Sequence, residues 1–274
     1  MKTPRKSTNN PKSNTLIDLV INSKLSTYEK NLVLNYPIES INIDFVYALI
    51  NNDFPIEYLV KRSIINNTEI LVSPDVLLPR SESLGLVDLA SNDHCKQGIF
   101  FDIGTGSGYL SIFIAKRNKN NTIYASDINL KALLIAQSNI INLGLQNQVI
   151  LKPGSLLHPF RRIIEKKKVP KHFILNLPYI DPKNVEEIGI STYKHEPHSA
   201  LFTVGSVRIY EKLFDQITMF NIRNYKLYME INPQSIKKIK SIIAQNLPNT
   251  KISSHHDIYN HNRFLTVTDK YFCM

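Results

Sequence analysis

Three glycines at alternate positions are the first residues in the chain that could do chemistry. Gly104, Gly106 and Gly108 stand in "FFDIGTGSGYLSIFIAK", between an apolar run and a helical pattern. Such glycines let the backbone pass close to a ligand and let its N–H groups point inward where a helix starts. Asp127 ends the next apolar run, where a carboxylate can accept both hydroxyls of a ribose. This order of features predicts a site for a nucleoside-type ligand.

A second set of such residues follows a later apolar run. The stretch "HFILNLPYI" brings an amide, a proline and an aromatic ring in Asn176, Pro178 and Tyr179. Buried strands usually pass into turn residues such as Gly, Asp or Ser. Pro178 favours an extended backbone at Leu177. One interpretation is a plain strand-end turn, and the other is a binding site beside the glycine turn.

The elements that must position these residues alternate along the chain. From about residue 84, short apolar runs are separated by helical stretches such as "NLKALLIAQSNIINLGL". This alternation predicts parallel strands with crossover helices, hence a doubly wound α/β sheet. The last run follows a short connection, which favours an antiparallel final strand. The predicted strands are 99–103, 122–127, 148–152, 172–177, 225–231 and 263–268.

The segments before this sheet differ in character. Residues 1–15 are basic and lack acids, which predicts a disordered tail. Residues 16–68 are interpreted as a helical domain, in which helical patterns continue to residue 66 and Ser26 and Glu29 have capping-box spacing. Residues 69–83 are expected to form an extended or hairpin linker with a turn at 73–75. Residues 84–274 then form the sheet domain.

The glycine motif resembles a known one. "DIGTGSG" is similar to motif I of the class I S-adenosylmethionine-dependent methyltransferases, and Asp127 matches their ribose-binding acid. The resemblance implies a seven-stranded sheet with a reversed last strand, and S-adenosyl-L-methionine as the cofactor. The cofactor-binding residues that it implies are Asp102, Gly104, Thr105, Gly106, Ser107, Gly108, Asp127, Leu156 and Asn176.

"NLPY" then resembles the Asn-Pro-Pro-Tyr signature of methyltransferases that modify planar nitrogens. Such a nitrogen is a poor nucleophile because its lone pair is delocalised. The Asn176 side-chain oxygen and the Leu177 carbonyl could accept its two N–H hydrogens, and the Tyr179 ring could pack on its plane. The resemblance gives Asn176, Pro178 and Tyr179 as catalytic residues. No strong general base is required, because the methylated cationic nitrogen is itself acidic.

The flanking segments are similar to one subfamily. "VSPDVLLPRSES", "HEPHSALF", "YMEINPQS" and "DIYNHNRFLTV" resemble, in order, motifs of the protein-(glutamine-N5) methyltransferases that act on peptide chain release factors. The implied reaction methylates the side-chain nitrogen of the glutamine in a Gly-Gly-Gln loop. The helical domain would help hold this protein substrate. Substrate-binding residues would be Asn176, Leu177, Pro178, Tyr179 and Glu196.

The chain also departs from the family pattern. Arg80 and Glu82 are retained, and an ion pair that supports the active-site wall is expected. Glu196 is either a buttress of the substrate loop or a solvated acid, and Glu230, at the end of a strand, has either an orienting role or no role in the site. Asn232 and Asn260 stand where the family has glycines, and because asparagine tolerates positive φ next best to glycine, the backbone shape is expected to persist. The departures are Ser81, Leu84, Ser155, Leu177, Asn232 and Asn260.

Composition narrows the setting. The chain has 274 residues and a formal charge of +10, which suits an acidic protein or a nucleic acid as partner. Cys95 and Cys273 cannot make a disulfide framework, so a reducing compartment is expected. We predict a cytoplasmic monomer with no membrane span, and the basic start leaves a mitochondrial address open. The histidines lack metal-ligand spacing, so no metal site is predicted.

Four functions remain open from the sequence. The leading one is methylation of a release factor glutamine, and a second is methylation of a ribosomal protein glutamine. An exocyclic-amine methyltransferase acting on nucleic acid would suit the charge but not the flanking motifs. A non-catalytic binding module would require that the departures had removed activity.

Overall fold

The computed structural model describes residues 20, 23–36, 38, 43–95, 97–166 and 168–273. The basic tail predicted over 1–15 lies outside these residues. The chain divides into two compact units, residues 1–61 and 62–274, which we describe separately. None of the described helices has the length and apolar character that a membrane span requires.

The first unit contains the helices α2 (Thr27–Asn35), α3 (Ile43–Asn51) and α4 (Ile56–Val60). The predicted capping box at the start of α2 is present. The Glu29 N–H donates to Ser26 Oγ at 3.3 Å, and the Ser26 N–H donates to Glu29 Oε2 at 2.7 Å. Helix α4 ends at Lys61, which adopts the left-handed conformation at φ 56°.

A β-hairpin replaces the end of the predicted helical stretch. Strands β1 (Arg62–Ile65) and β2 (Thr68–Leu71) pair antiparallel, although we expected helix to residue 66. The reason is the turn, because Asn66 and Asn67 both take positive φ, at 45° and 58°, as a two-residue hairpin turn requires. The predicted turn at 73–75 is confirmed by the hydrogen bond from the Val76 N–H to the Ser73 carbonyl, 3.0 Å.

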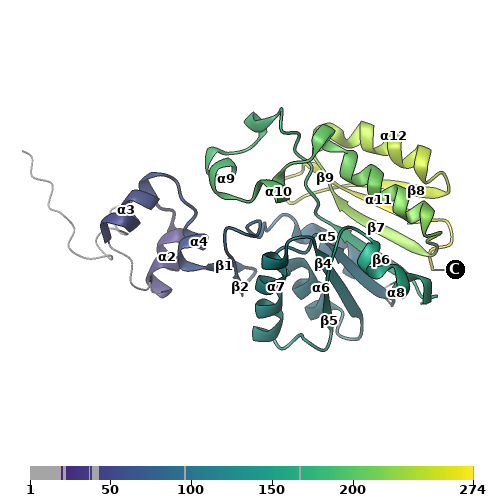
Figure 1. The fold of residues 1–274 in the computed structure, drawn as a ribbon, viewed down its shortest axis with the longest axis horizontal. Helices are drawn as coiled ribbons and strands as arrows, with labels where there is room; N and C mark the ends of the chain where they lie inside the picture. The colour runs from purple at the N-terminus through teal and green to yellow at the C-terminus, as the bar shows by residue number, and fades with distance from the viewer. Residues whose placement is uncertain are drawn as a thin grey trace, which may run out of the picture. The chain divides into compact units, whose positions relative to one another are not determined.

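Seven strands form the main sheet (Figure 1). Their order is β5-β4-β3-β6-β7-β9-β8, and β9 alone among them runs antiparallel to its two neighbours. This confirms the predicted α/β class and the reversed last strand. Strand β8 has no counterpart among the predicted runs, because "TKISSHH" is polar. The bounds are β3 Ile99–Ile103, β4 Thr122–Asp127, β5 Val149–Pro153, β6 Lys171–Leu175, β7 Tyr225–Glu230, β8 Thr250–His256 and β9 Asn262–Asp269.

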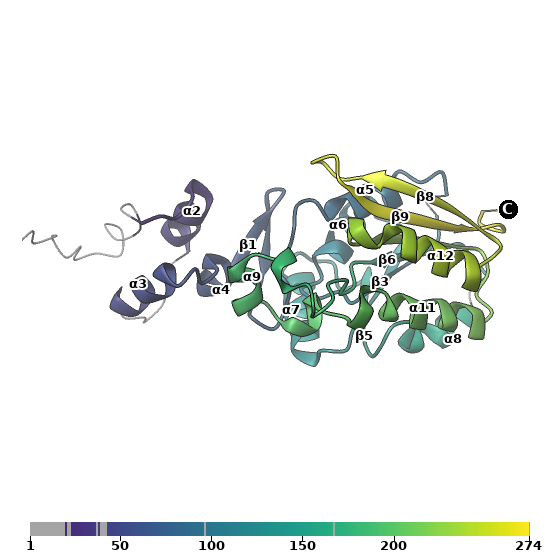
Figure 2. The same ribbon diagram turned by 90° about the horizontal axis from the view of Figure 1, so that it is seen from above.

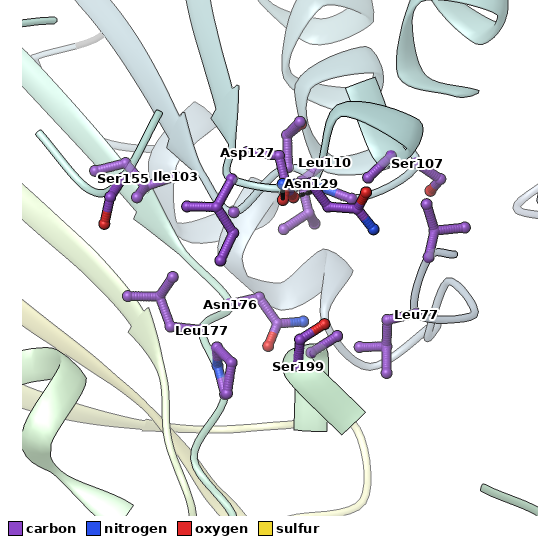
Figure 3. A pocket seen from close by; sticks show the side chains of 18 of the residues that line it. Leu77, Ile103, Ser107, Leu110, Asp127, Asn129, Ser155, Asn176, Leu177 and Ser199 are labelled. Atoms are coloured by element: carbon purple, nitrogen blue, oxygen red, sulfur yellow. Dashed lines mark hydrogen bonds between the residues drawn. The ribbon is translucent and has the colours of Figure 1, made fainter. Parts of the chain in front are cut away.

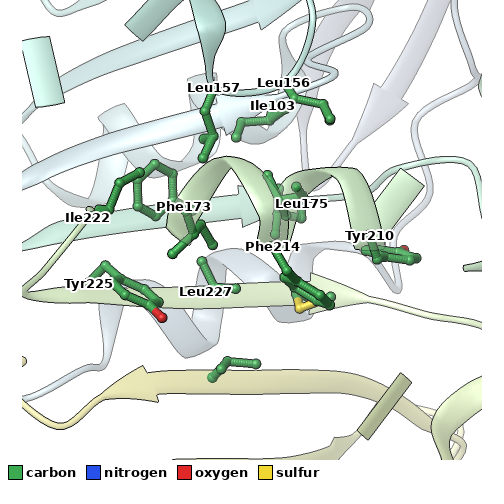
Figure 4. Packing of buried hydrophobic residues seen from close by; sticks show 14 of the residues in the cluster. Ile103, Leu156, Leu157, Phe173, Leu175, Tyr210, Phe214, Ile222, Tyr225 and Leu227 are labelled. Carbon is green, nitrogen blue, oxygen red and sulfur yellow. The ribbon is translucent and has the colours of Figure 1, made fainter. Parts of the chain in front are cut away.

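Helices cover both faces of this sheet (Figure 2). One face carries α5 (Leu84–Ser91), α6 (Tyr109–Arg117) and α7 (Leu130–Asn142), and the other carries α8 (Arg161–Lys166), α11 (Arg208–Met219) and α12 (Ile236–Asn246). The core on the second face joins Phe173 of β6 and Leu227 of β7 to Phe214 of α11 (Figure 4). The short helices α9 (Ile190–His195) and α10 (His198–Leu201) lie in the long connection after β6.

A buried polar cluster lies at the amino end of the strands, away from the glycine turn. His172 Nδ1 is 3.1 Å from the Tyr228 hydroxyl, which also donates to Asp93, and Asp93 pairs with Lys226. Nearby, the C-terminal segment after β9 returns to the loop before β3.

A disulfide joins the C-terminal segment to the loop before β3. It links Cys95 and Cys273, whose Cα atoms are 6.1 Å apart. We expected no disulfide framework from two cysteines, and a reducing compartment. The bond departs from that expectation because the fold brings together two residues that are 178 positions apart.

Candidate active site

A cavity opens at the carboxyl edge of the sheet, where β3, β4 and β6 end (Figure 3). Its water-accessible volume is about 140 Å³. The glycine turn, the end of β4 and the start of "NLPY" all line it. The predicted residues found in its wall are Gly104, Thr105, Gly106, Ser107, Asp127, Leu156, Asn176, Leu177 and Pro178.

Asp102 holds the glycine turn from behind. Its carboxylate is buried and accepts hydrogen bonds from the hydroxyls of Thr105 and Ser111, each at 2.7 Å, and from the Ser111 N–H at 3.2 Å. Burial raises the pKa of this carboxyl, while these donors lower it. Asp102 does not line the cavity. The arrangement gives it a supporting role for the turn that faces the ligand.

The middle glycine leaves room for a ligand. A Cβ atom on Gly106 would meet no protein atom within 4 Å. The φ of +55° at this residue is the feature that favours glycine. By contrast, a Cβ on Gly108 would approach the Ala136 Cβ atom of α7 to 3.1 Å. Gly108 therefore serves close helix packing, whereas Gly106 keeps its side of the cavity open.

Asp127 is fixed by two backbone donors. The Gly106 N–H donates to its Oδ2 and the Asn129 N–H to its Oδ1, both at 2.9 Å. A carboxylate has about four acceptor sites, so each oxygen retains capacity for a ribose hydroxyl. Ile128 and Leu156 add apolar walls on either side. Leu156 has φ +49°, an unusual conformation for a bulky residue, which turns the chain at this wall.

A second cavity adjoins the first. It is lined by charged and aromatic side chains, including Arg80, Glu82, Tyr179, Glu230 and Arg263. The two cavities share Leu77, Asn176, Leu177 and Ala200. The start of "NLPY" therefore stands where one cavity meets the other.

Asn176 is oriented at this junction by one hydrogen bond. Its Nδ2 donates to Ser83 Oγ at 3.2 Å, and its Oδ1 accepts no hydrogen bond from the part of the chain that the structure describes. The side-chain amide thus keeps its acceptor for a group that enters between the cavities.

Tyr179 is held by a buried carboxylate. Its hydroxyl donates to Glu230 Oε1 at 3.2 Å, and Arg263 Nη1 lies 3.7 Å from the same oxygen. Burial raises the pKa of Tyr179 and of Glu230, and Arg263 lowers both. Arg263 is itself anchored by Asp257, with Nε 2.7 Å from Oδ2. This chain of contacts fixes the tyrosine ring beside Asn176.

Glu196 fastens two segments together. Its carboxylate is buried, with Oε1 at 2.5 Å from Arg80 Nη2, while its Oε2 accepts from the Leu78 N–H at 3.1 Å. The ion pair expected of Arg80 therefore exists with Glu196, and not with Glu82. The burial of Glu196 agrees with a buttress rather than with a solvated acid.

Several lining residues were not foreseen. Residues 75–77, Tyr109, Ser199 and Ala200 line the first cavity, and Ser83 holds Asn176. The motifs "VSPDVLLPRSES" and "HEPHSALF" contain most of them, but only the fold shows which members face the cavity. Asn139 links the segment before residues 75–77 to the glycine turn. Its Oδ1 accepts from the Leu71 N–H at 2.6 Å, and its Nδ2 donates to the Leu71 carbonyl at 3.0 Å and to the Ser107 carbonyl at 2.9 Å.

The two asparagines that replace glycines behave differently. Asn260 adopts φ 64°, as expected. Asn232 does not take positive φ, for its φ is −65°. Its side chain instead accepts from the Gln234 N–H at 2.9 Å, which caps a short 3₁₀ turn.

Known proteins resemble this chain in sequence. A family model described as a methyltransferase domain matches residues 89–169. The release factor glutamine methyltransferase of Streptococcus pneumoniae is 28% identical over 229 residues, which cover 83% of this chain and 79% of that protein. The protein of the same name from Flavobacterium psychrophilum is 27% identical over 241 residues, with 84% and 81% covered. The chain is a methyltransferase related to these proteins.

Solved structures agree with the fold of this methyltransferase. The hMettl16 catalytic domain, in complex with the MAT2A 3'UTR hairpin 6, superposes with a TM-score of 0.56 at 11% identity, over 86% of this chain and 95% of that one. A human methyltransferase 10 domain containing protein gives 0.54 at 14% identity, over 85% and 99%. These similarities concern the fold alone.

Proposed function

We propose that this methyltransferase transfers a methyl group from S-adenosylmethionine to the side-chain amide nitrogen of a glutamine in a peptide chain release factor. The observation that carries the proposal is the position of Asn176. Its unengaged Oδ1 stands where the two cavities meet, so one cavity can hold the cofactor and the other a side-chain amide.

The first cavity suits this cofactor. The open side of Gly106 leaves room for it against the backbone, and Asp127 has acceptor capacity for the ribose hydroxyls. Ile128 and Leu156 offer apolar surface for the adenine. When bound, S-adenosylmethionine supplies an electrophilic methyl group, whose bond to sulfur breaks as the bond to nitrogen forms.

The second cavity supplies the groups that orient an amide. Asn176 Oδ1 and the Leu177 carbonyl accept the two N–H hydrogens of the glutamine, which directs the nitrogen lone pair toward the cofactor cavity. The same acceptors stabilise the positive charge that develops on nitrogen. The Tyr179 ring packs on the amide plane and is held by Glu230. One proton then leaves the cationic nitrogen for water, without a dedicated base.

The choice of a release factor rests on the relatives, whose names state that substrate. We propose that the helical unit before residue 62 contacts the protein substrate, as the sequence resemblance implies. We also propose that the enzyme acts as a cytoplasmic monomer. The second candidate is an exocyclic-amine methyltransferase for nucleic acid, which the net charge of +10 favours.

One experiment separates these functions. Purified protein is incubated with S-adenosylmethionine and an unmethylated release factor, and the Gly-Gly-Gln peptide is analysed by mass spectrometry. We expect one added methyl on the glutamine, and none with Asn176→Ala. Transfer to RNA or DNA instead, with binding that weakens steeply in salt, would support the second candidate. Cofactor binding without transfer to either would contradict both.

A further inference from the structure

The residues after β9 form a cover at the amino end of the sheet. We call residues 270–273 the C-terminal strap. Its Phe272 is buried, and this ring meets the His172 ring edge to face, with centroids 5.3 Å apart and planes at 83°. His172 has no exposed surface. The other side of the Phe272 ring system borders His94, at 6.2 Å, so the strap lies between the loop before β3 and the start of β6.

The strap also borders the buried polar cluster at this end of the strands. Lys226 Nζ, which pairs with Asp93, lies 6.0 Å from the centroid of the Phe272 ring. His172 and Tyr228 of the same cluster have no exposed surface. Removal of the Phe272 ring would therefore admit water to polar groups that the closed fold keeps dry.

Apart from the disulfide, few contacts hold the strap. In the part of the chain that the structure describes, two of its backbone donors reach other segments. The Lys270 N–H donates to the Asn249 carbonyl at 3.1 Å, next to the end of β9. The Cys273 N–H donates to Asn224 Oδ1 at 3.0 Å. With so few bonds, the covalent link at Cys273 is the main constraint that keeps Phe272 in place.

The two cysteines of this link differ in exposure. Cys95 is 4% exposed, whereas Cys273 is an exposed residue. A disulfide is reduced when a thiolate attacks one of its two sulfur atoms, and access helps to decide which one is attacked. A thiolate from solution therefore reaches Cys273 first.

We propose that the disulfide between Cys95 and Cys273 is a thiol-exchange site that fastens and releases the C-terminal strap. One thiolate of a dithiol reductant attacks Cys273 Sγ and forms a mixed disulfide, while the Cys95 sulfur leaves as a thiolate and takes up a proton. The second thiol of the reductant, as its thiolate, then displaces Cys273, which is protonated in turn. One dithiol is oxidised to a disulfide, and the protein gains two thiols.

The thiol state of the surroundings thus decides whether Phe272 covers His172. The oxidised chain keeps the strap closed, and the reduced chain lets it open locally while the sheet stays folded. The cavity lies at the opposite, carboxyl edge of the sheet, so this site is separate from the proposed methyl transfer and does not depend on it.

The first test treats the folded, oxidised full chain with thiols and no denaturant, then maps the cysteines by alkylation and peptide mass spectrometry. Dithiothreitol should free both cysteines and leave the far-ultraviolet circular dichroism spectrum unchanged. Glutathione should give a mixed disulfide at Cys273 and a free thiol at Cys95. Glutathione on Cys95, two free cysteines in air-oxidised protein, a disulfide that yields only in urea, or loss of the spectrum on reduction would each overturn the inference.

The second test measures the cover itself with diethyl pyrocarbonate, which acylates accessible imidazoles, after the reductant has been removed under argon. Reduction should speed the modification of His172 at least about 10-fold, because the strap then opens locally. The exposed His158 is the internal control and should react equally in both states. Equal protection of His172 before and after reduction would overturn the inference.

Matched variants show that the strap is the cause. Cys95→Ser combined with Cys273→Ser should give the fast modification of His172 in oxidising and reducing buffer alike. Phe272→Ala should give it while the disulfide is intact, whereas Tyr271→Ala, at the exposed neighbouring ring, should stay protected. Protection that persists in oxidised Phe272→Ala would contradict the assignment of this ring as the cover.

Discussion

Mild acid should destabilise the fold through His172. This residue of β6 is fully buried, and its ring stacks on Phe100 at 4.4 Å between centroids. The pKa of His172 is lowered to about 4, mainly by burial; Asp93 opposes this shift, and the charge of Lys226 contributes to it. In the unfolded chain the pKa is about 6.5. The folded protein therefore binds fewer protons, and its stability falls as the pH drops below 6.5.

The magnitude follows from these two pKa values. At pH 5 an unfolded histidine is almost fully protonated and the buried one is almost neutral. The resulting loss of stability between pH 7 and pH 5 is about 2 kcal/mol, and the full effect below pH 4 is about 3.4 kcal/mol. Set against a typical total of about 5 to 15 kcal/mol, this is a large change from one side chain.

Urea unfolding at pH 7 and pH 5 measures this effect. His172→Phe keeps a ring of similar size but removes the titrating group, so its stability should fall by about 2 kcal/mol less over this interval than that of the wild type. His158→Gln, at an exposed site, is the control and should match the wild type. If His172→Phe and the wild type lose equal stability, the buried histidine is not the group that senses acid.

Three further changes test the site and its supports. Asp127→Ala should weaken S-adenosylmethionine binding about 10-fold or more in calorimetry, because the ribose loses its acceptor; unchanged affinity would place the ribose elsewhere. Arg80→Ala leaves the buried Glu196 carboxylate without its cation, so the unfolding free energy should fall by about 2 kcal/mol, and Arg80→Ala with Glu196→Gln should lose less than Arg80→Ala alone. Cys95→Ser should lower the unfolding free energy by about 4 to 5 kcal/mol in oxidising buffer, because the disulfide with Cys273 closes a loop of 178 positions. With reductant present, the wild type and Cys95→Ser should have the same urea midpoint.

The inner strands could be predicted because burial dictates their composition. Strands β3 and β4 match the predicted 99–103 and 122–127; β3 is buried throughout, and β4 alternates half-buried with buried residues over its first four positions. Strand β8 was not predicted because its side chains are at most partly buried, and such a strand needs no apolar pattern in its sequence. The end of the helical stretch was misplaced because Asn66 and Asn67 were not interpreted as a hairpin turn.

The candidate site could be predicted where it depends on local motifs. The glycine turn, Asp127 and Asn176 stand at strand ends, and the topology alone brings strand ends together. The cover of the cofactor cavity depends on contacts between distant segments, such as those of Glu196 with residues 78 and 80. Ser83 lies in a recognised motif, yet its hydrogen bond with Asn176, 93 positions away, follows only from the fold.

The polar composition of the edge strand β8 affects whether the sheet can pair with a second molecule. A sheet edge exposes unpaired N–H and C=O groups, and a flat apolar edge strand can recruit a second chain. In β8, Lys251 and His256 are exposed, and none of the residues is Phe, Tyr or Trp. At the opposite edge, β5 ends with the exposed Lys152 and Pro153. The composition that concealed β8 from prediction therefore also discourages the sheet from growing from one molecule into the next.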